Sequence, residues 1–196
     1  MIQYLEQYRG QMTDVLNSVD LARVDEFIRI FTQAREEGRG IFVFGNGGSA
    51  ATASHFAVDM VKGASAGREK RFRMMALTDQ APVITAYAND IGYDVVFDQH
   101  LRNFARPGDV VLALSASGNS PNVLRAVEYA NSIGCVTLGM SGFDGGQLAK
   151  LASHALVVAS SHMGRVEDAH MFACHLIAYY FMEAEKQAPN AASRAS

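Results

Sequence analysis

Five short apolar runs, separated by segments with helical spacing of apolar residues, constrain most strongly how this chain can fold. Strands that alternate with helices form parallel sheets, and strands that are apolar along their whole length are buried on both faces. We therefore expect an α/β fold, a doubly wound three-layer α/β/α sandwich whose five parallel strands follow the flavodoxin-like order. The runs are Ile41–Phe44, Met74–Thr78, Val110–Ser115, Cys135–Met140 and Ala155–Ser160.

Helical patterns lie at both ends of the chain. Two extra helices are expected before the first strand, over residues 2–18 and 21–36, the second with Asp20 as its N-cap. A long final helix is expected over residues 165–186, with apolar residues on more than one face, which suggests packing between subunits. We expect a single domain over residues 1–188 and a small, polar, disordered tail over residues 189–196.

Composition excludes several classes of protein. With 196 residues, 49% of them hydrophobic, the chain suits one α/β domain rather than two. The net charge of −3 comes from scattered residues without a basic stripe, which argues against direct nucleic-acid binding. There is no signal-peptide core and no run of roughly 18 apolar residues, so we expect a cytoplasmic protein that makes no membrane contact.

Two loops at the expected carboxyl ends of the strands carry residues suited to a ligand. Gly45-Asn46-Gly47-Gly48-Ser49 follows the first strand, where glycines permit close backbone approach and Ser49 can cap the next helix. Ser115-Ala116-Ser117-Gly118-Asn119-Ser120 follows the third strand, with Pro121 in the first helical turn. Either loop alone is compatible with an ordinary capping turn. Together, their hydroxyls and helix N-termini predict a phosphate site, whereas the lack of GxGxxG argues against a dinucleotide.

Several segments resemble a known family when they are taken in order along the chain. They are FVFGNGGSAATASHFAVDM, Ala88-Asn89-Asp90, LSASGNSPNV, SGFDGGQLA and RVEDAHMFACH. They resemble successive signature segments of the sugar isomerase (SIS) domain family, in its phosphoheptose isomerase branch. The resemblance implies an enzyme that interconverts sedoheptulose 7-phosphate and D-glycero-D-manno-heptose 7-phosphate through an enediol. It also implies a homotetramer with sites at subunit interfaces, where His175 could meet Asp59 of another copy.

The resemblance implies roles for individual residues. Asp59 corresponds to the catalytic base and His175 to the acid. The spacing of these residues along the expected helices agrees with a common site. His55 and Asp59 share one face of their helix, and Glu167 and His175 lie about 80° apart around the axis of the final helix. Because a tight metal ligand is not a free proton carrier, the division of labour stays open. The implied zinc ligands are His55, Asp59, Glu167 and His175, and the implied substrate-binding residues are Asn46, Gly47, Ser49, Asp90, Ser115, Ser117, Asn119, Ser120 and Glu167.

Three positions depart from the family pattern. Asp59 stands where the family has glutamate, and a shift on the order of 1 Å in a base can cost about a hundredfold in rate. Glu167 replaces the usual glutamine, which adds a negative charge that favours a divalent cation. Gly164 replaces an aspartate, and the neighbouring His162 and Arg165 are candidate substitutes or solvated side chains.

Two alternatives to a phosphoheptose isomerase remain open. One is a non-catalytic SIS module, either a sugar-phosphate sensor or an adaptor that binds the bacterial replication initiator DnaA. Such adaptors lack the carboxylate that Asp59 retains. The other is an isomerase of a different phosphosugar, since the sequence does not specify chain length or stereochemistry.

Overall fold

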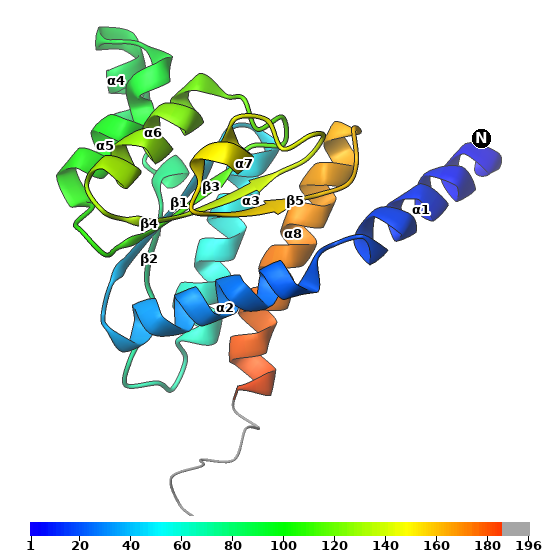
Figure 1. Cartoon of the computed structure of the whole chain (residues 1–196), viewed down its shortest axis with the longest axis horizontal. Coiled ribbons are helices and arrows are strands. Elements are labelled where there is room, and N and C mark those ends of the chain that lie inside the picture. The colour runs from blue at the N-terminus through cyan, green and yellow to red at the C-terminus, as the bar shows by residue number, and fades with distance from the viewer. Residues whose placement is uncertain (186–196) are drawn as a thin grey trace, which may run out of the picture.

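A five-stranded parallel sheet forms the centre of the computed structural model, which describes residues 1–185 (Figure 1). The strand order is β2-β1-β3-β4-β5, and every neighbouring pair is parallel. The predicted fold class, strand number and flavodoxin-like order are therefore confirmed. The strands are β1 (Gly40–Gly45), β2 (Arg73–Ala76), β3 (Val110–Leu114), β4 (Val136–Ser141) and β5 (His154–Val157).

Helices cover both faces of this sheet, as the apolar strands require. Successive strand residues point to opposite faces, so Ile41 and Val43 join one buried cluster while Phe42 and Phe44 join the other. Helices α2, α3 and α8 cover the first face, and α5, α6 and α7 cover the second, whereas α1 extends away from the sheet and joins the first cluster only near its C-terminal end, at Val15 (Figure 1). The helices are α1 (Ile2–Asn17), α2 (Leu21–Glu36), α3 (Gly48–Val58), α4 (Ala81–Asp90), α5 (Val96–Phe104), α6 (Pro121–Ser132), α7 (Leu148–Leu151) and α8 (Met163–Tyr179).

Short turns of other helical types extend or connect these elements. The π-helical turns η1 (Asp59–Ala64) and η4 (Tyr180–Ala184) continue α3 and α8, and the 3₁₀ turns are η2 (Leu77–Asp79) and η3 (Tyr93–Val95). Asp20 caps α2 as predicted, because its Oδ1 accepts hydrogen bonds from the backbone N–H groups of Ala22 and Arg23. No helix within residues 1–185 is long and apolar enough to cross a bilayer.

Some predicted boundaries need correction. The last strand was expected to reach Ser160 but ends at Val157. Beyond Val157, the Ser160 N–H donates to the carbonyl of Val158, and the Ser160 carbonyl accepts from the N–H of Phe143. This segment therefore no longer pairs with β4 as a strand. The last helix starts at Met163 rather than residue 165, because His162 Nδ1 accepts from the Arg165 N–H and caps it. The tail predicted over residues 189–196 lies outside the described residues, and the extent of the domain stays a prediction.

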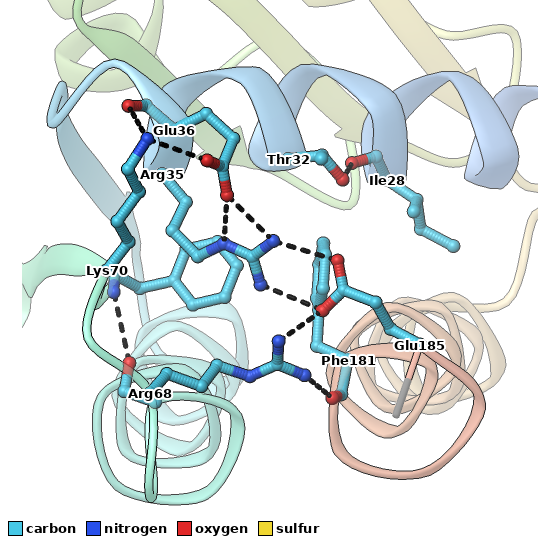
Figure 2. A network of polar contacts seen from close by, with 10 residues as sticks. Ile28, Thr32, Arg35, Glu36, Arg68, Lys70, Phe181 and Glu185 are labelled. Carbon is cyan, nitrogen blue, oxygen red and sulfur yellow. Dashed lines mark hydrogen bonds and ion pairs between the residues drawn. The ribbon is translucent and has the colours of Figure 1, made fainter. Parts of the chain in front are cut away.

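A buried arginine fastens the end of α8 and η4 to α2 (Figure 2). The Arg35 side chain is 6% exposed and donates through Nη1 and Nη2 to the two carboxylate oxygens of Glu185, at 2.8 Å each. Its guanidinium carbon lies over both the Phe72 and the Phe181 ring, 5.2 and 5.4 Å from their centroids. Arg68 adds a second cation, with Nη1 2.7 Å from Glu185 Oε2. Bidentate ion pairs of this kind combine charge with fixed geometry.

The pair predicts a pH-dependent contribution to stability. Hydrogen bonding and charge from Arg35 lower the pKa of the Glu185 carboxyl below its ordinary value of 4.5. A lowered pKa means that the carboxylate stabilises the fold above the unfolded value and that this contribution is lost as the pH falls through the folded value. We expect Glu185→Gln to lower the free energy of unfolding by about 1–3 kcal/mol at pH 7, and by less near pH 4.

Urea denaturation of the two proteins at both pH values measures this effect. The exposed Arg29–Asp25 pair provides the control, since Arg29→Gln should change stability by less than about 1 kcal/mol. A Glu185→Gln effect that stays constant between pH 7 and pH 4 would contradict the argument.

Candidate active site

A pocket of about 180 Å³ lies at the carboxyl edge of the sheet, where the loops after β1 and β3 meet. Two of its serines, Ser49 and Ser115, are buried, with 5% and 4% exposure. None of the described residues that line it is Lys or Arg. Its polar donors are therefore hydroxyls, an amide and the backbone N–H groups of adjoining helix N-termini, which suit a phosphate. The lining residues are Asn46, Ser49, Leu114, Ser115, Ala116, Ser117, Ser120, Met163 and Glu167.

The loop after β3 is held in shape by glycine and by Asn119. Gly118 has a φ of +66°, and a Cβ there would lie 2.2 Å from the carbonyl oxygen of Gly145, so only glycine fits. The Asn119 Nδ2 donates to the carbonyl of Ser117 at 2.9 Å, and its Oδ1 accepts from the N–H of Gln147 at 3.1 Å. Asn119 thus braces the loop and is not among the residues lining the pocket.

Two helices begin at the pocket. Ser120 precedes α6, and its Oγ lies 3.1 Å from that of Ser115 instead of capping the helix. The expectation that Ser49 caps the helix after β1 is wrong, because α3 begins one residue earlier and Gly47, with φ +54°, is its N-cap. Ser49 lies within the first turn of α3, where its side chain lines the pocket.

Glu167 reaches the same pocket from α8. A Cβ at Gly48 would lie 2.4 Å from Glu167 Oε2, so the carboxylate packs directly against the start of α3. The positive end of a helix dipole favours a negative charge at that place. The absence of a side chain at Gly48 leaves the space that this carboxylate occupies.

A second centre joins α3 to α8 through two histidines and one carboxylate. Nε2 of His55 and Nε2 of His175 lie 3.2 Å apart, and they are 3.5 and 3.7 Å from Oδ2 of Asp59. Asp59 Oδ2 is buried without a hydrogen-bond partner. His175 therefore meets Asp59 within one chain rather than across an interface. We refer to His55, Asp59 and His175 as the triad.

The geometry of the triad fits a zinc ion. Ligand atoms about 2.0–2.1 Å from a tetrahedral zinc lie about 3.4 Å from one another, which is the range of the three separations. One ligand atom from each residue lies within 4.8 Å of the others. An unpartnered carboxylate oxygen facing two imidazole nitrogens is the donor set that zinc prefers, and three protein ligands leave one position for water or substrate.

The pocket and the triad lie at different heights along the same two helices. Ser49 and Asp59 are about 15 Å apart along α3, and Glu167 and His175 about 12 Å apart along α8, at about 1.5 Å per residue. Helices α3 and α8 pack side by side beneath the sheet (Figure 1). Glu167 consequently belongs to the pocket and is not among the residues grouped around Asp59, and its predicted role as a zinc ligand stays a prediction.

The remaining predicted residues lie outside both centres. Asp90 ends α4 in an exposed position, where its Oδ1 accepts from Asn89 Nδ2. Gly164, at the position of the family's aspartate, faces the hydroxyl of Tyr8, to which its Cβ would come within 3.4 Å. His162 and Arg165, the candidate substitutes for that aspartate, make other contacts. His162 caps α8, and the Arg165 guanidinium lies 5.2 Å from the centroid of the Tyr8 ring.

Sequence reasoning missed three residues at the pocket. Met163 lines it from the first turn of α8, and Asn122 and Tyr93 hydrogen-bond to Asn46. Asn122 could have been found as a polar residue in the first turn after the serine loop, facing a ligand-binding edge. The isolated Tyr93 carries no comparable signal.

Comparison with known proteins places the chain in a family. Residues 3–142 match the model of the SIS domain. The probable phosphoheptose isomerase of Thermoplasma volcanium is 41% identical over 160 residues, which cover 82% of this chain and 81% of that protein. The phosphoheptose isomerase of Syntrophotalea carbinolica is 35% identical over 175 residues, covering 88% of this chain and 89% of that protein.

A solved structure agrees with both sequence matches. Phosphoheptose isomerase GmhA from Neisseria gonorrhoeae superposes with a TM-score of 0.84 at 27% identity, covering 91% of this chain and 97% of that chain. The chain therefore belongs to the SIS domain family, within its phosphoheptose isomerase branch.

Proposed function

We propose that this protein is an aldose–ketose isomerase that interconverts sedoheptulose 7-phosphate and D-glycero-D-manno-heptose 7-phosphate. The observation that carries the proposal is the triad, which places a carboxylate oxygen and two imidazole nitrogens within 3.7 Å of one another in a chain that also has a serine-rich pocket. An isomerase needs both a proton-transfer centre and a phosphate anchor. Relatives that are 32–41% identical carry the name phosphoheptose isomerase.

The serine pocket binds the phosphate. Ser115, Ser117 and Ser120 supply hydroxyl donors, and the N-terminus of α6 supplies backbone donors and the positive end of its dipole. Asn46, Ser49 and the backbone of Gly47 contact the adjoining hydroxyls of the sugar, and Asp90 approaches the sugar chain. Glu167 repels a phosphate dianion, so it accepts from sugar hydroxyls rather than facing the phosphate.

The triad moves the proton. Asp59 removes a proton from C1 of the ketose while His175 protonates the oxygen on C2, which gives the enediol. Return of a proton to C2, with loss of the proton on the C1 oxygen, then yields the aldose. Asp59 Oδ2 faces the two histidines, which leaves Oδ1 as the oxygen that exchanges the proton.

We further propose that the triad holds zinc. Nε2 of His55, Nε2 of His175 and Oδ2 of Asp59 would be its ligands, which leaves Oδ1 of Asp59 and the Nδ1–H of His175 for proton transfer. A bound zinc ion supplies a Lewis acid that polarises the substrate carbonyl and stabilises the developing negative charge.

The assembly proposed is a homotetramer with its sites at subunit interfaces, in the cytoplasm. A groove of about 440 Å³ on the outer side of α8 is lined by Phe172, His175, Leu176, Tyr179, Tyr180, Glu183 and Ala184. Val58 and Val61, beside Asp59, are also exposed. Burial of this apolar surface by another copy would close the triad off from water. The free buried thiols Cys135 and Cys174 agree with a reducing compartment.

Removal of either proposed proton carrier should abolish turnover. We expect Asp59→Ala and His175→Ala to lower kcat with sedoheptulose 7-phosphate by at least about a hundredfold, since acid–base groups contribute roughly that much or more. His154→Ala is the matched control, because His154 pairs with Glu26 at the opposite edge of the sheet. An NMR assay of the heptose phosphates measures the rates. Wild-type rates in Asp59→Ala would exclude the proposed mechanism.

The zinc proposal predicts a stoichiometric metal. Inductively coupled plasma mass spectrometry of protein purified without chelator should find about one zinc per chain, and His55→Ala should lose most of it, because one of three ligands is gone. His154→Ala should retain the metal. Full activity in a metal-free preparation would argue that the triad works without an ion.

The assembly proposal predicts that charges on the outer helix face separate the subunits. Tyr180→Glu and Val61→Glu should convert tetramers into smaller species in size-exclusion chromatography with light scattering, because a carboxylate buried in an apolar interface loses its hydration. Phe104→Glu, on the exposed face of α5 across the sheet, should leave the mass unchanged. A monomeric wild-type protein would refute a shared site.

A further inference from the structure

The side chain of Asn46 is held by two residues that come from other parts of the chain. Asn46 Nδ2 donates to Asn122 Oδ1, and Asn122 Nδ2 donates to Asn46 Oδ1, each at 2.9 Å. The hydroxyl of Tyr93 donates to the same Asn46 Oδ1 at 2.9 Å. Asn122 is 2% exposed, and Asn46 is half-buried in the wall of the serine pocket.

The backbone determines which way these amides face. Oxygen and nitrogen of an asparagine are ordinarily distinguished only by their hydrogen-bond partners. Here the backbone N–H of Val123, which can only donate, lies 3.0 Å from Asn122 Oδ1. The orientation of Asn122 follows from that contact, and the orientation of Asn46 follows from Asn122, because the opposite choice would set two NH₂ groups against each other.

The donors and acceptors of Asn46 can then be counted. A carboxamide oxygen has two lone pairs and the nitrogen two N–H groups. Tyr93 and Asn122 occupy both lone pairs, and one N–H is used by Asn122. The group that Asn46 retains for a ligand in the pocket is a single N–H.

The two partners are themselves fastened to the elements that build the site. Asn122 lies in the first turn of α6, directly after the serine loop, and Tyr93 lies in η3, just after Asp90. Arg125 of α6 joins these segments, with Nε 3.2 Å from Asp98 Oδ1 and Nη1 3.8 Å from Asp94 Oδ2. The contacts to Asn46 therefore tie the loops after β1, α4 and β3 together.

We infer that Tyr93 and Asn122 are positioning residues that saturate the oxygen of Asn46, so that Asn46 meets the substrate only as a hydrogen-bond donor. The inference rests on the proposed function, in which Asn46 contacts the sugar. The oxygen bound by Asn46 must then accept, as a carbonyl oxygen, an enediolate oxygen or a hydroxyl lone pair does. Tyr93 acts through Asn46 and does not touch the substrate.

A double-mutant cycle tests the route through Asn46. Tyr93→Phe should lower kcat/KM about three- to tenfold, as expected for one hydrogen bond, without changing the melting temperature. In an Asn46→Ala background the same substitution should change kcat/KM by less than about twofold, because the group it positions is gone. Tyr87→Phe, whose hydroxyl is near Asn103, is the control. An undiminished effect of Tyr93→Phe in Asn46→Ala, or none in wild type, would overturn the inference.

A measurement on the free protein separates this inference from the isomerase proposal. The side-chain ¹⁵N–¹H signals of Asn46, assigned by their loss in Asn46→Ala, should include one proton protected from exchange with water. Asn122→Ala, which removes the oxygen that accepts this proton, should abolish that protection, whereas Asn122→Asp, which keeps an accepting oxygen, should retain it. Exchange as fast as that of exposed Asn17 in the wild type would refute the positioning, whether or not the protein turns over a heptose phosphate.

Discussion

Parallel pairing of five strands with both faces covered is the constraint from which the site follows. Because each strand must return to the same end of the sheet, each crossover helix that packs on it starts near the carboxyl edge. That geometry brings the N-termini of α3, α6 and α8 to one place, and their backbone N–H groups and dipoles point into it. An anion can be bound there without Lys or Arg, which leaves the pocket free of flexible cationic side chains.

Rigid helices set the spacing between the two centres. Ser49 and Asp59 belong to one continuous helical segment, and Glu167 and His175 belong to another. The distance between the pocket and the triad therefore cannot change unless one of these helices breaks. An isomerase that anchors a phosphate at one end of an extended sugar needs its proton-transfer groups at a defined distance from that anchor. Helices provide this distance more reliably than loops.

Charge and shape at the pocket are coupled through small residues. The carboxylate of Glu167 occupies the space left by the missing side chain of Gly48, and the serine loop closes only because Gly118 adopts a left-handed conformation against Gly145. Glu167, where the family resemblance implies a glutamine, puts a negative charge beside the proposed phosphate site. The positive end of the α3 dipole offsets part of the repulsion between this carboxylate and a phosphate. A carboxylate can also accept hydrogen bonds from the hydroxyl groups of the sugar.

The sequence by itself determined the fold class, the strand order, the Asp20 cap and the serines that line the pocket, because these follow from apolar periodicity and from loop residues at strand ends. The pairing of His55 and Asp59 followed from helical spacing. Only the tertiary structure decided that His175 meets them within one chain, that Glu167 lies at the pocket instead, and that Tyr93 and Asn122 hold Asn46. Local patterns specify which face of an element a residue occupies. The depth at which two elements pack depends on the volumes of side chains distant in the sequence, and that depth decides which polar groups meet.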